Sequence, residues 1–268
     1  MRRAPAVAGL FYPAQREQLE RLLDTCLGPP AAEPEPAVAC LVPHAGYIYS
    51  GPVAGAVYRR LLLPRRFIIL CPRHHPVGQP LAILSSGSWQ TPLGDVPVDT
   101  ALAHALRQAC PLLREDPEAH RLEHSLEVQL PFLQRLLGEF QFVPVALGTA
   151  VLAALEELGR AVARVVAEAG EPVLIIASSD MNHYESDAVT RQKDRKAIER
   201  ILALDPAGLF RTVAEEEISM CGFAAAVAML TAARELGASR AELVRYATSG
   251  DVTGDRSAVV GYAGIVIQ

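Results

Sequence analysis

Histidines follow several apolar runs in this 268-residue chain, where they are placed to act together. His44, the adjacent pair His74 and His75, and His183 each come within a few residues of the end of a strand-like run. The carboxyl ends of parallel strands share one edge of an α/β sheet, and such folds bind ligands there. Because imidazole is a common metal ligand and titrates near neutral pH, these histidines predict a metal or acid/base site at that edge.

The adjacent histidines His74 and His75 cannot both enter one site if their backbone is extended. Consecutive side chains of extended backbone point to opposite sides. We therefore expect His74 to enter the site, while His75 orients a neighbour or faces solvent.

A polar segment from Ser178 to Tyr184 ends the third of these runs. Polar groups at the end of a buried strand are costly unless they are paired, which favours a use for Asp180 and His183. We expect Asp180 to pair with His183 and to set its tautomer and basicity. The alternative is a structural hydrogen-bond network around Asp180.

Two further segments carry candidate side chains. His124 lies between acidic residues at the start of a predicted helix. Acidic residues are typical of any helix start, but a histidine there could also donate a hydrogen bond to an anionic or carbonyl substrate. Asp251 and Asp255 lie in a glycine-rich segment before the last predicted strand, where both a turn role and a ligand role are open.

Composition excludes several classes of protein. Half of the residues are hydrophobic, the net charge is −5 and no basic tract stands out, which argues against nucleic acid as a partner. There is no apolar run of about 18 residues, so we expect no membrane span. The cysteines are odd in number and form no C-x-x-C pattern: Cys26, Cys40, Cys71, Cys110 and Cys221. We interpret them as reduced core thiols of a cytoplasmic protein rather than as disulfides or ligands.

Apolar strands alternate with amphipathic helices along the chain, which predicts a single α/β domain over 1–268. The sheet is expected to be mostly parallel and covered by helices on both faces. Predicted strands cover 37–42, 67–71, 142–147, 173–178, 243–247 and 258–267, with a hairpin-like piece within 81–98. Predicted helices cover 15–27, 52–62, 101–110, 124–137, 152–169, 188–204, 206–213 and 222–236.

Six motifs in this order resemble the Memo family, whose prokaryotic members are called AmmeMemoRadiSam system protein B. They are Pro43-His44-Ala45-Gly46-Tyr47, Pro72-Arg73-His74-His75, Thr91-Pro92-Leu93-Gly94-Asp95, Glu123-His124-Ser125-Leu126-Glu127, Ser178-Ser179-Asp180 through His183, and Gly261-Tyr262-Ala263-Gly264. The resemblance covers nearly the whole chain. It implies a fold similar to the class III (LigB-type) extradiol dioxygenases, which are non-haem iron enzymes.

The resemblance also implies roles for individual residues. His44 and His74 would be metal ligands, His183 would be the acid/base histidine, and His124 and Asp180 would accompany it in the pocket.

The third metal ligand is where this chain departs from the family. Animal members have a cysteine before the last strand, where this chain has Asp251 at or next to the matching position. Two histidines and one carboxylate suit Fe(II), which we therefore expect, with copper or zinc as alternatives.

Three functions follow from this interpretation. The first is a mononuclear non-haem iron enzyme, resembling an extradiol dioxygenase, that acts on a small chelating molecule. The second is a non-catalytic metal or redox module that works with AMMECR1-type and radical SAM partner proteins, as the system name implies. The third is a metal-free binder of anions or phosphopeptides.

Overall fold

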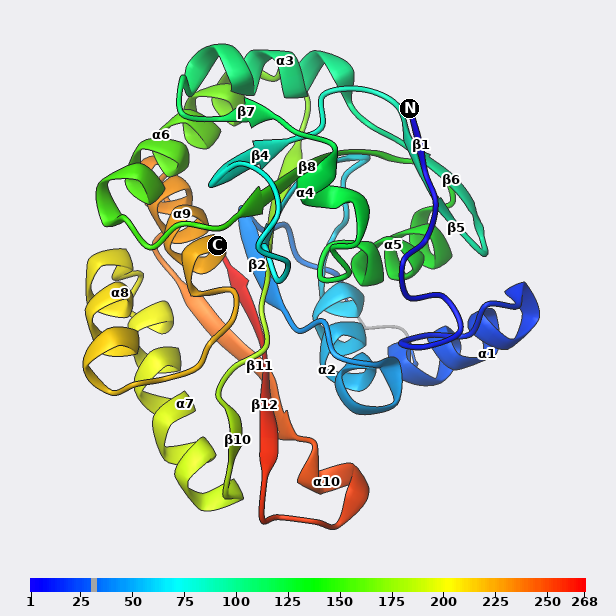
Figure 1. Cartoon of the computed structure of the whole chain (residues 1–268), viewed down its shortest axis with the longest axis vertical. Helices are drawn as coiled ribbons and strands as arrows, with labels where there is room; N and C mark the ends of the chain where they lie inside the picture. The colour runs from blue at the N-terminus through cyan, green and yellow to red at the C-terminus, as the bar shows by residue number, and fades with distance from the viewer. Residues whose placement is uncertain (30–32) are drawn as a thin grey trace.

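The computed structural model describes residues 1–29 and 33–268, and within them a nine-stranded mixed sheet has helices on both faces (Figure 1). The strands of this sheet are β2 (Ala39–Val42), β3 (Arg66–Pro72), β4 (Leu81–Ile83), β7 (Arg114–Glu115), β8 (Gln141–Leu147), β9 (Val173–Ser178), β10 (His183–Glu185), β11 (Ala241–Thr248) and β12 (Val259–Ile267). A second, three-stranded sheet contains β1 (Arg2–Arg3), β5 (Ser88–Thr91) and β6 (Gly94–Pro97).

The helices follow the expected alternation with the strands. They are α1 (Arg16–Leu27), α2 (Tyr47–Arg60), α3 (Thr100–Ala109), α4 (Glu118–Arg121), a 3-10 turn η1 (Glu127–Gln129), α5 (Leu130–Leu137), α6 (Leu152–Glu168), α7 (Asp187–Leu202), α8 (Pro206–Glu215), α9 (Phe223–Glu235) and α10 (Gly250–Thr253). Helix α9 packs on β2, β3 and β9, and α2 packs on β2, β11 and β12 from the other side (Figure 1). Among the described helices, none is long and apolar enough to cross a membrane.

Four parallel strands form the centre of the sheet, in the order β2-β9-β3-β8. Their residues are almost all buried, because both faces are covered, and this explains their near-continuous apolar sequences. On either side the pairing is antiparallel, between β12 and β2 and between β4 and β8. The α/β class is thus confirmed, as a mixed sheet whose parallel pairs are the central ones and the edge pair β4–β7.

Two helices begin elsewhere than predicted. Helix α2 starts at Tyr47 rather than at Pro52, and the Ser50 hydroxyl in its first turn donates to the carbonyl of Ala45. The helix predicted from His124 is replaced by η1 and α5, and His124 lies in the loop before them. The Glu123 carboxylate accepts hydrogen bonds from the backbone and hydroxyl of Ser125, which holds this segment as a local turn.

A buried ion pair holds the N-terminal segment against this loop. Arg3 donates to the Glu127 carboxylate at 2.7 Å, to the carbonyl of His120 at 2.6 Å and to the carbonyl of Glu123 at 2.7 Å. Glu127 also accepts from the backbone N–H groups of Ala6 and Val7 and from the hydroxyl of Tyr12: those bonds are 2.7, 3.1 and 2.6 Å long. The first dozen residues are therefore fixed to the segment that carries His124.

Candidate metal centre

Three donor side chains meet at the carboxyl edge of the central strands. His44 follows β2, His74 follows β3, and Cys221 directly precedes α9. One donor atom from each lies within 4.8 Å of the others, and Nε2 of His44 is 3.2 Å from Sγ of Cys221. Donors around a tetrahedral ion with bonds of roughly 2.0 to 2.3 Å stand about 3.3 to 3.8 Å apart. The three side chains thus have the chemistry and the spacing to hold one ion.

Glu123 orients His74. Its buried carboxylate accepts from Nδ1 of His74 at 2.8 Å and from the backbone N–H of His74 at 2.6 Å. Burial acts to raise the pKa of Glu123, but the hydrogen bonds and charge of His74 and the bond from Ser125 outweigh it and hold that pKa well below its usual range. When His74 is neutral and donates Nδ1–H to this carboxylate, its lone pair lies on Nε2, which is how histidines that bind metals are commonly arranged.

Ser178 orients His44 in the same way. The Ser178 hydroxyl donates to the carbonyl of Ser125 at 2.6 Å and accepts from the Gln129 amide at 2.9 Å. Its remaining contact, with Nδ1 of His44 at 3.0 Å, must therefore be accepted from His44. This leaves the lone pair of His44 on Nε2, the atom that faces Cys221.

The Cys221 thiol is neutral as the side chains stand, because burial and the nearby Asp180 carboxylate raise its pKa. A bound cation would remove this proton, since metals bind thiolates. Sequence reasoning missed Cys221 by grouping it with the core cysteines. Of the five, only Cys221 is not fully buried, and it precedes a predicted helix. Its place just before a predicted helix is the feature of the sequence that could have pointed to Cys221.

His124, His183 and Asp180 lie around the three donors. The ring of His124 stacks on that of His74, with centroids 4.6 Å apart, and burial lowers the pKa of His124 to about 4. His183 places Nδ1 2.8 Å from the carbonyl of Ser219, so Nδ1 carries the proton and Nε2 is free to accept one. Asp180 accepts from the backbone N–H of His44 at 2.7 Å, and burial raises the pKa of Asp180 to about 7. The structure does not pair Asp180 with His183 as expected; it pairs Asp180 with the backbone of His44.

The structure does not bring Asp251 to the histidines. Asp251 lies in α10, where it accepts from the backbone N–H of Thr248 and from Arg191, both at 2.9 Å, and forms an ion pair with Arg256 at 3.4 Å. Its charge is therefore used to hold the turn between β11 and β12. Asp255, the alternative, accepts from Ser257 in the same turn. The structure thus places Cys221, and not Asp251, beside His44 and His74.

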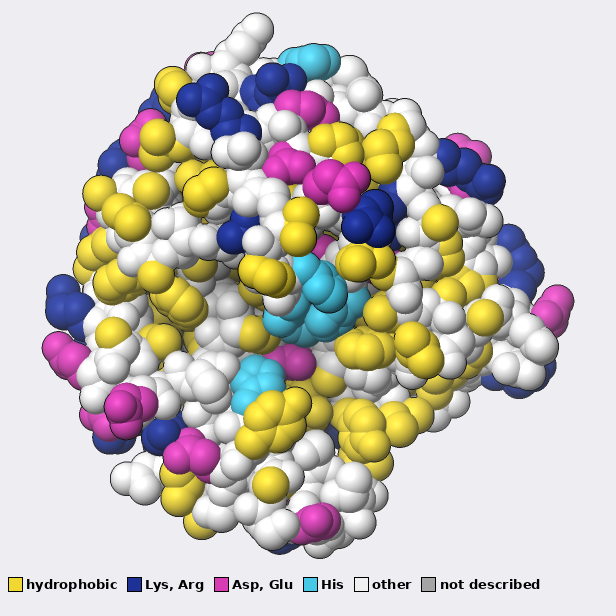
Figure 2. Space-filling view, viewed as in Figure 1, with side chains coloured by type: hydrophobic (Ala, Val, Ile, Leu, Met, Phe, Trp, Pro, Cys, Tyr) yellow, Lys and Arg dark blue, Asp and Glu magenta, His cyan; other side chains and the backbone are white. Residues whose placement is uncertain are grey.

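The donors lie in a cavity of about 740 Å³. It is lined by Leu10, Phe11, His44, Ala45, Gly46, Tyr49, His74, His124, Asp180, His183, Tyr184, Ser219, Cys221 and Val260. Figure 2 shows histidine side chains gathered in the middle of one face, with hydrophobic side chains around them. His75 is exposed and absent from this lining, so of the adjacent pair only His74 reaches the cavity.

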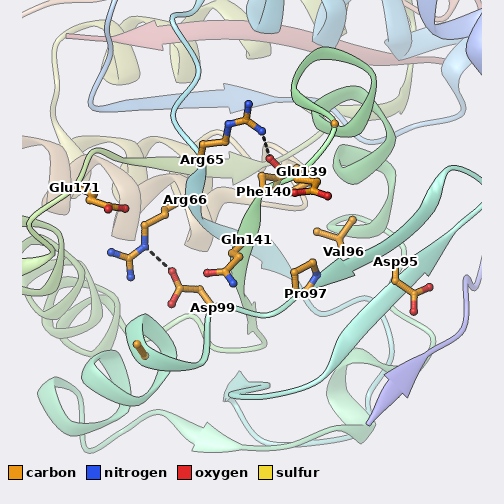
Figure 3. A pocket seen from close by; sticks show the side chains of 12 residues that line it. Arg65, Arg66, Asp95, Val96, Pro97, Asp99, Glu139, Phe140, Gln141 and Glu171 are labelled. Atoms are coloured by element: carbon orange, nitrogen blue, oxygen red, sulfur yellow. Dashed lines mark hydrogen bonds and ion pairs between the residues drawn. The ribbon is translucent and has the colours of Figure 1, made fainter.

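A larger cavity, of about 840 Å³, lies at the opposite edge of the sheet (Figure 3). Its arginines are already engaged: Arg65 donates to the carbonyls of Leu137 and Glu139, and Arg66 pairs with Asp99 at 2.6 Å. These contacts tie the starts of β3 and β8 to neighbouring loops. The histidine edge is therefore the better candidate for chemistry despite its smaller cavity.

A sequence profile described as Memo-like protein matches residues 3–266. The chain belongs to the Memo family. A MEMO1 family protein of Methanopyrus kandleri is 45% identical over 281 aligned residues, covering 100% of this chain and 99% of the relative. A MEMO1 family protein of Pyrobaculum arsenaticum is 44% identical, covering 99% of both chains, and one of Methanothermobacter thermautotrophicus is 40% identical, covering 98% of this chain and 99% of the relative.

Among solved structures, the Memo-family chain is similar to an uncharacterized protein from Escherichia coli K12. The TM-score is 0.54, with 10% sequence identity, over 85% of this chain and 98% of that chain. At this identity the likeness shows the fold alone. The resemblance to the Memo family is thus confirmed, and the likeness to LigB-type dioxygenases stays a prediction.

Proposed function

We propose that this Memo-family chain binds one transition-metal ion through His44, His74 and Cys221 and acts on a small molecule held beside it. The observation that supports this most is the convergence of two free imidazole lone pairs and a thiol on one point. Each imidazole is fixed in the tautomer that a metal needs, by Glu123 and by Ser178. Such fixing is costly to build and is typical of metal sites.

Fe(II) is the ion we favour, with copper and zinc as the competitors. Fe(II) is carried over from the resemblance to non-haem iron enzymes, whereas the Cys221 thiolate by itself favours copper or zinc. When bound, the ion would supply Lewis-acid or redox chemistry to a chelating group of the substrate.

Protons would be handled by His183 and His124. Burial lowers the pKa of both side chains, so both are neutral at pH 7. His183 holds its own proton against the carbonyl of Ser219, which leaves Nε2 to accept a proton from a hydroxyl or thiol in the cavity. Asp180, with a pKa of about 7, can hold a proton beside the donors near neutral pH.

The lining argues against the metal-free alternative. Among the described residues that line this cavity, none is a lysine or an arginine. Sites for phosphate or carboxylate groups usually supply such cations. The cavity therefore favours a neutral molecule over an anion or a phosphopeptide.

An anaerobic Fe(II) titration of metal-stripped protein tests the proposal. We expect one site in the wild type, weakened at least about tenfold in Cys221→Ala and in His44→Ala. Asp251→Ala is the matched control, because it removes a carboxylate that the resemblance nominated but the structure places elsewhere, and its affinity should equal that of the wild type. Unchanged affinity in Cys221→Ala would contradict the proposed ligand set.

The identity of the ion is tested separately, by the metal content of protein purified under argon. Iron at one equivalent would support our choice, and copper or zinc at that level would replace it. Cobalt(II) substitution adds a direct readout, since a thiolate-to-cobalt absorption band should be present in the wild type and absent in Cys221→Ala.

A further inference from the structure

An apolar groove leads away from the candidate metal centre across the N-terminal loop. A second hollow, of about 470 Å³, lies between this loop and the starts of α1 and α2. It shares lining residues with the histidine cavity: Leu10, Phe11, Gly46 and Tyr49. The two spaces are therefore adjacent, with these four residues between them. We call the second the Leu10–Ile48 groove, after the two most exposed large apolar residues in its lining.

The groove offers a ligand mostly apolar surface, together with the side-chain amides of Gln15 and Gln18. Leu10 is 80% exposed and Ile48 is 59% exposed. Its lining, within the described residues, includes no Asp, Glu, Lys, Arg or His, and the hydroxyl of Tyr12 is turned away to Glu127. Exposed apolar surface that adjoins a site is typical of binding surfaces. A charged or strongly polar chain would lose its water there without gaining a partner.

The groove is also already formed. Gly9 takes a positive φ of 86° and donates to the carbonyl of Tyr12 at 2.7 Å, while the N–H of Leu10 donates to the carbonyl of Val7 at 3.0 Å. The N–H of Tyr47 donates to the carbonyl of Phe11 at 2.9 Å, which ties this loop to α2. Leu10 is thus held out into solvent by a fixed backbone, and a preformed apolar surface costs little to occupy.

Phe11 connects the groove to the metal centre. Its ring lies 4.7 Å from the ring of His124, which stacks on His74. A chain that starts at the donors and passes over Phe11 enters the groove directly.

We propose that the Leu10–Ile48 groove holds the apolar tail of the molecule whose polar head lies at His44, His74 and Cys221. The ligand class is an amphiphile, with a neutral metal-chelating head and an unbranched or flat apolar tail of several carbon atoms. The position of the head rests on the proposed function, whereas the tail site rests on the groove itself.

A homologous series of straight-chain hydroxamic acids, from acetohydroxamic to octanohydroxamic acid, tests this by calorimetry on Fe(II)-loaded protein under argon. Each added methylene should tighten binding roughly two- to fourfold until the groove is full. The variant Ile48→Gln, at a residue that lines the groove but not the histidine cavity, should bind acetohydroxamic acid as the wild type does but show a weaker dependence on chain length. Leu62→Gln is the matched control, because Leu62 is 63% exposed but does not line the groove, and it should keep that dependence.

The outcomes separate the two proposals. Equal affinity for every chain length in the wild type would overturn the tail site and leave the metal centre intact. One outcome would support the tail site and contradict the metal centre. In it, octanohydroxamic acid binds metal-free protein and binds Ile48→Gln more weakly, while acetohydroxamic acid does not bind the Fe(II)-loaded protein. Absence of binding by every homologue would overturn both. Loss of chain-length dependence in Leu62→Gln would also count against the groove.

Discussion

Two adjacent arginines make ion pairs of equal length in opposite surroundings. Arg2 contacts Asp95 and Arg3 contacts Glu127, both at 2.7 Å. The side chain of Arg2 is 58% exposed and that of Arg3 is 2% exposed. Replacing each in turn by alanine therefore isolates the effect of burial on an ion pair.

The expected losses differ by several kilocalories. Arg3→Ala leaves the buried Glu127 carboxylate without a counter-ion, and removing one partner of a buried pair costs about 3–5 kcal/mol. It also removes the donors to the carbonyls of His120 and Glu123, while the N–H and hydroxyl donors that Glu127 retains act against the loss. We expect a net loss within that range. Arg2→Ala should lower the free energy of unfolding far less, because water replaces the lost partner.

Urea unfolding at pH 7, followed by circular dichroism, measures both losses. Arg3→Lys separates the effect of charge from that of geometry. Lysine restores a cation but cannot donate to Glu127 and to two carbonyls in the fixed directions of a guanidinium. Its free energy of unfolding should therefore lie between those of the wild type and Arg3→Ala. Equal free energies of unfolding for Arg2→Ala and Arg3→Ala, at unchanged urea dependence, would refute the reasoning.

Three further predictions concern single positions. A Cβ at Gly222 would overlap the carbonyl oxygen of Ser178, so Gly222→Ala should lower the free energy of unfolding by about 1–3 kcal/mol. Because the substitution would also displace the adjacent Cys221, it should weaken Fe(II) binding in the anaerobic titration. Burial raises the pKa of Asp194 to about 7, so the folded state binds a proton that the unfolded chain releases near pH 4. Stability should therefore fall as pH rises from about 4 to 7, and urea unfolding should show a smaller fall in Asp194→Asn; equal pH dependence in the two proteins would contradict this. Tyr184 lines the metal cavity and has a positive φ of 61°, a conformation that asparagine adopts more easily than tyrosine. Tyr184→Asn should therefore raise the free energy of unfolding by up to about 1 kcal/mol, as thermal unfolding would show, and should bind hydroxamic acids less tightly. A lower stability would argue against strain at this residue.

The strand patterns in the sequence predicted much of the fold and part of the candidate site. The four central strands were readable because they are buried on both faces, and the histidines at their ends lie together because parallel strands end at one edge. The structure brings His44, His74, His124 and His183 to one cavity, and their roles stay predictions.

The third donor could not be read in the same way. Cys221 follows two helices after β9, so its approach to His44 is set by how α9 packs on the sheet and not by any local pattern. Asp251 was predicted as the third ligand because it matches the position of a family cysteine in a turn. A turn between antiparallel strands can direct a side chain to either face of the sheet. His120 illustrates the same limit: its neighbours in the sequence are charged, yet its ring is fully buried beside Trp89.

One short segment organises both the candidate metal centre and the groove. Glu123 fixes the tautomer of His74, and four residues later Glu127 holds the loop that carries Leu10. Arg3 bonds to the carbonyl of the first and the carboxylate of the second. Docking of the N-terminal segment is therefore coupled to the orientation of a proposed metal ligand. For this reason, Arg3→Ala protein that is still folded at low temperature should weaken in Fe(II) affinity and in chain-length dependence together, whereas Arg2→Ala should change neither.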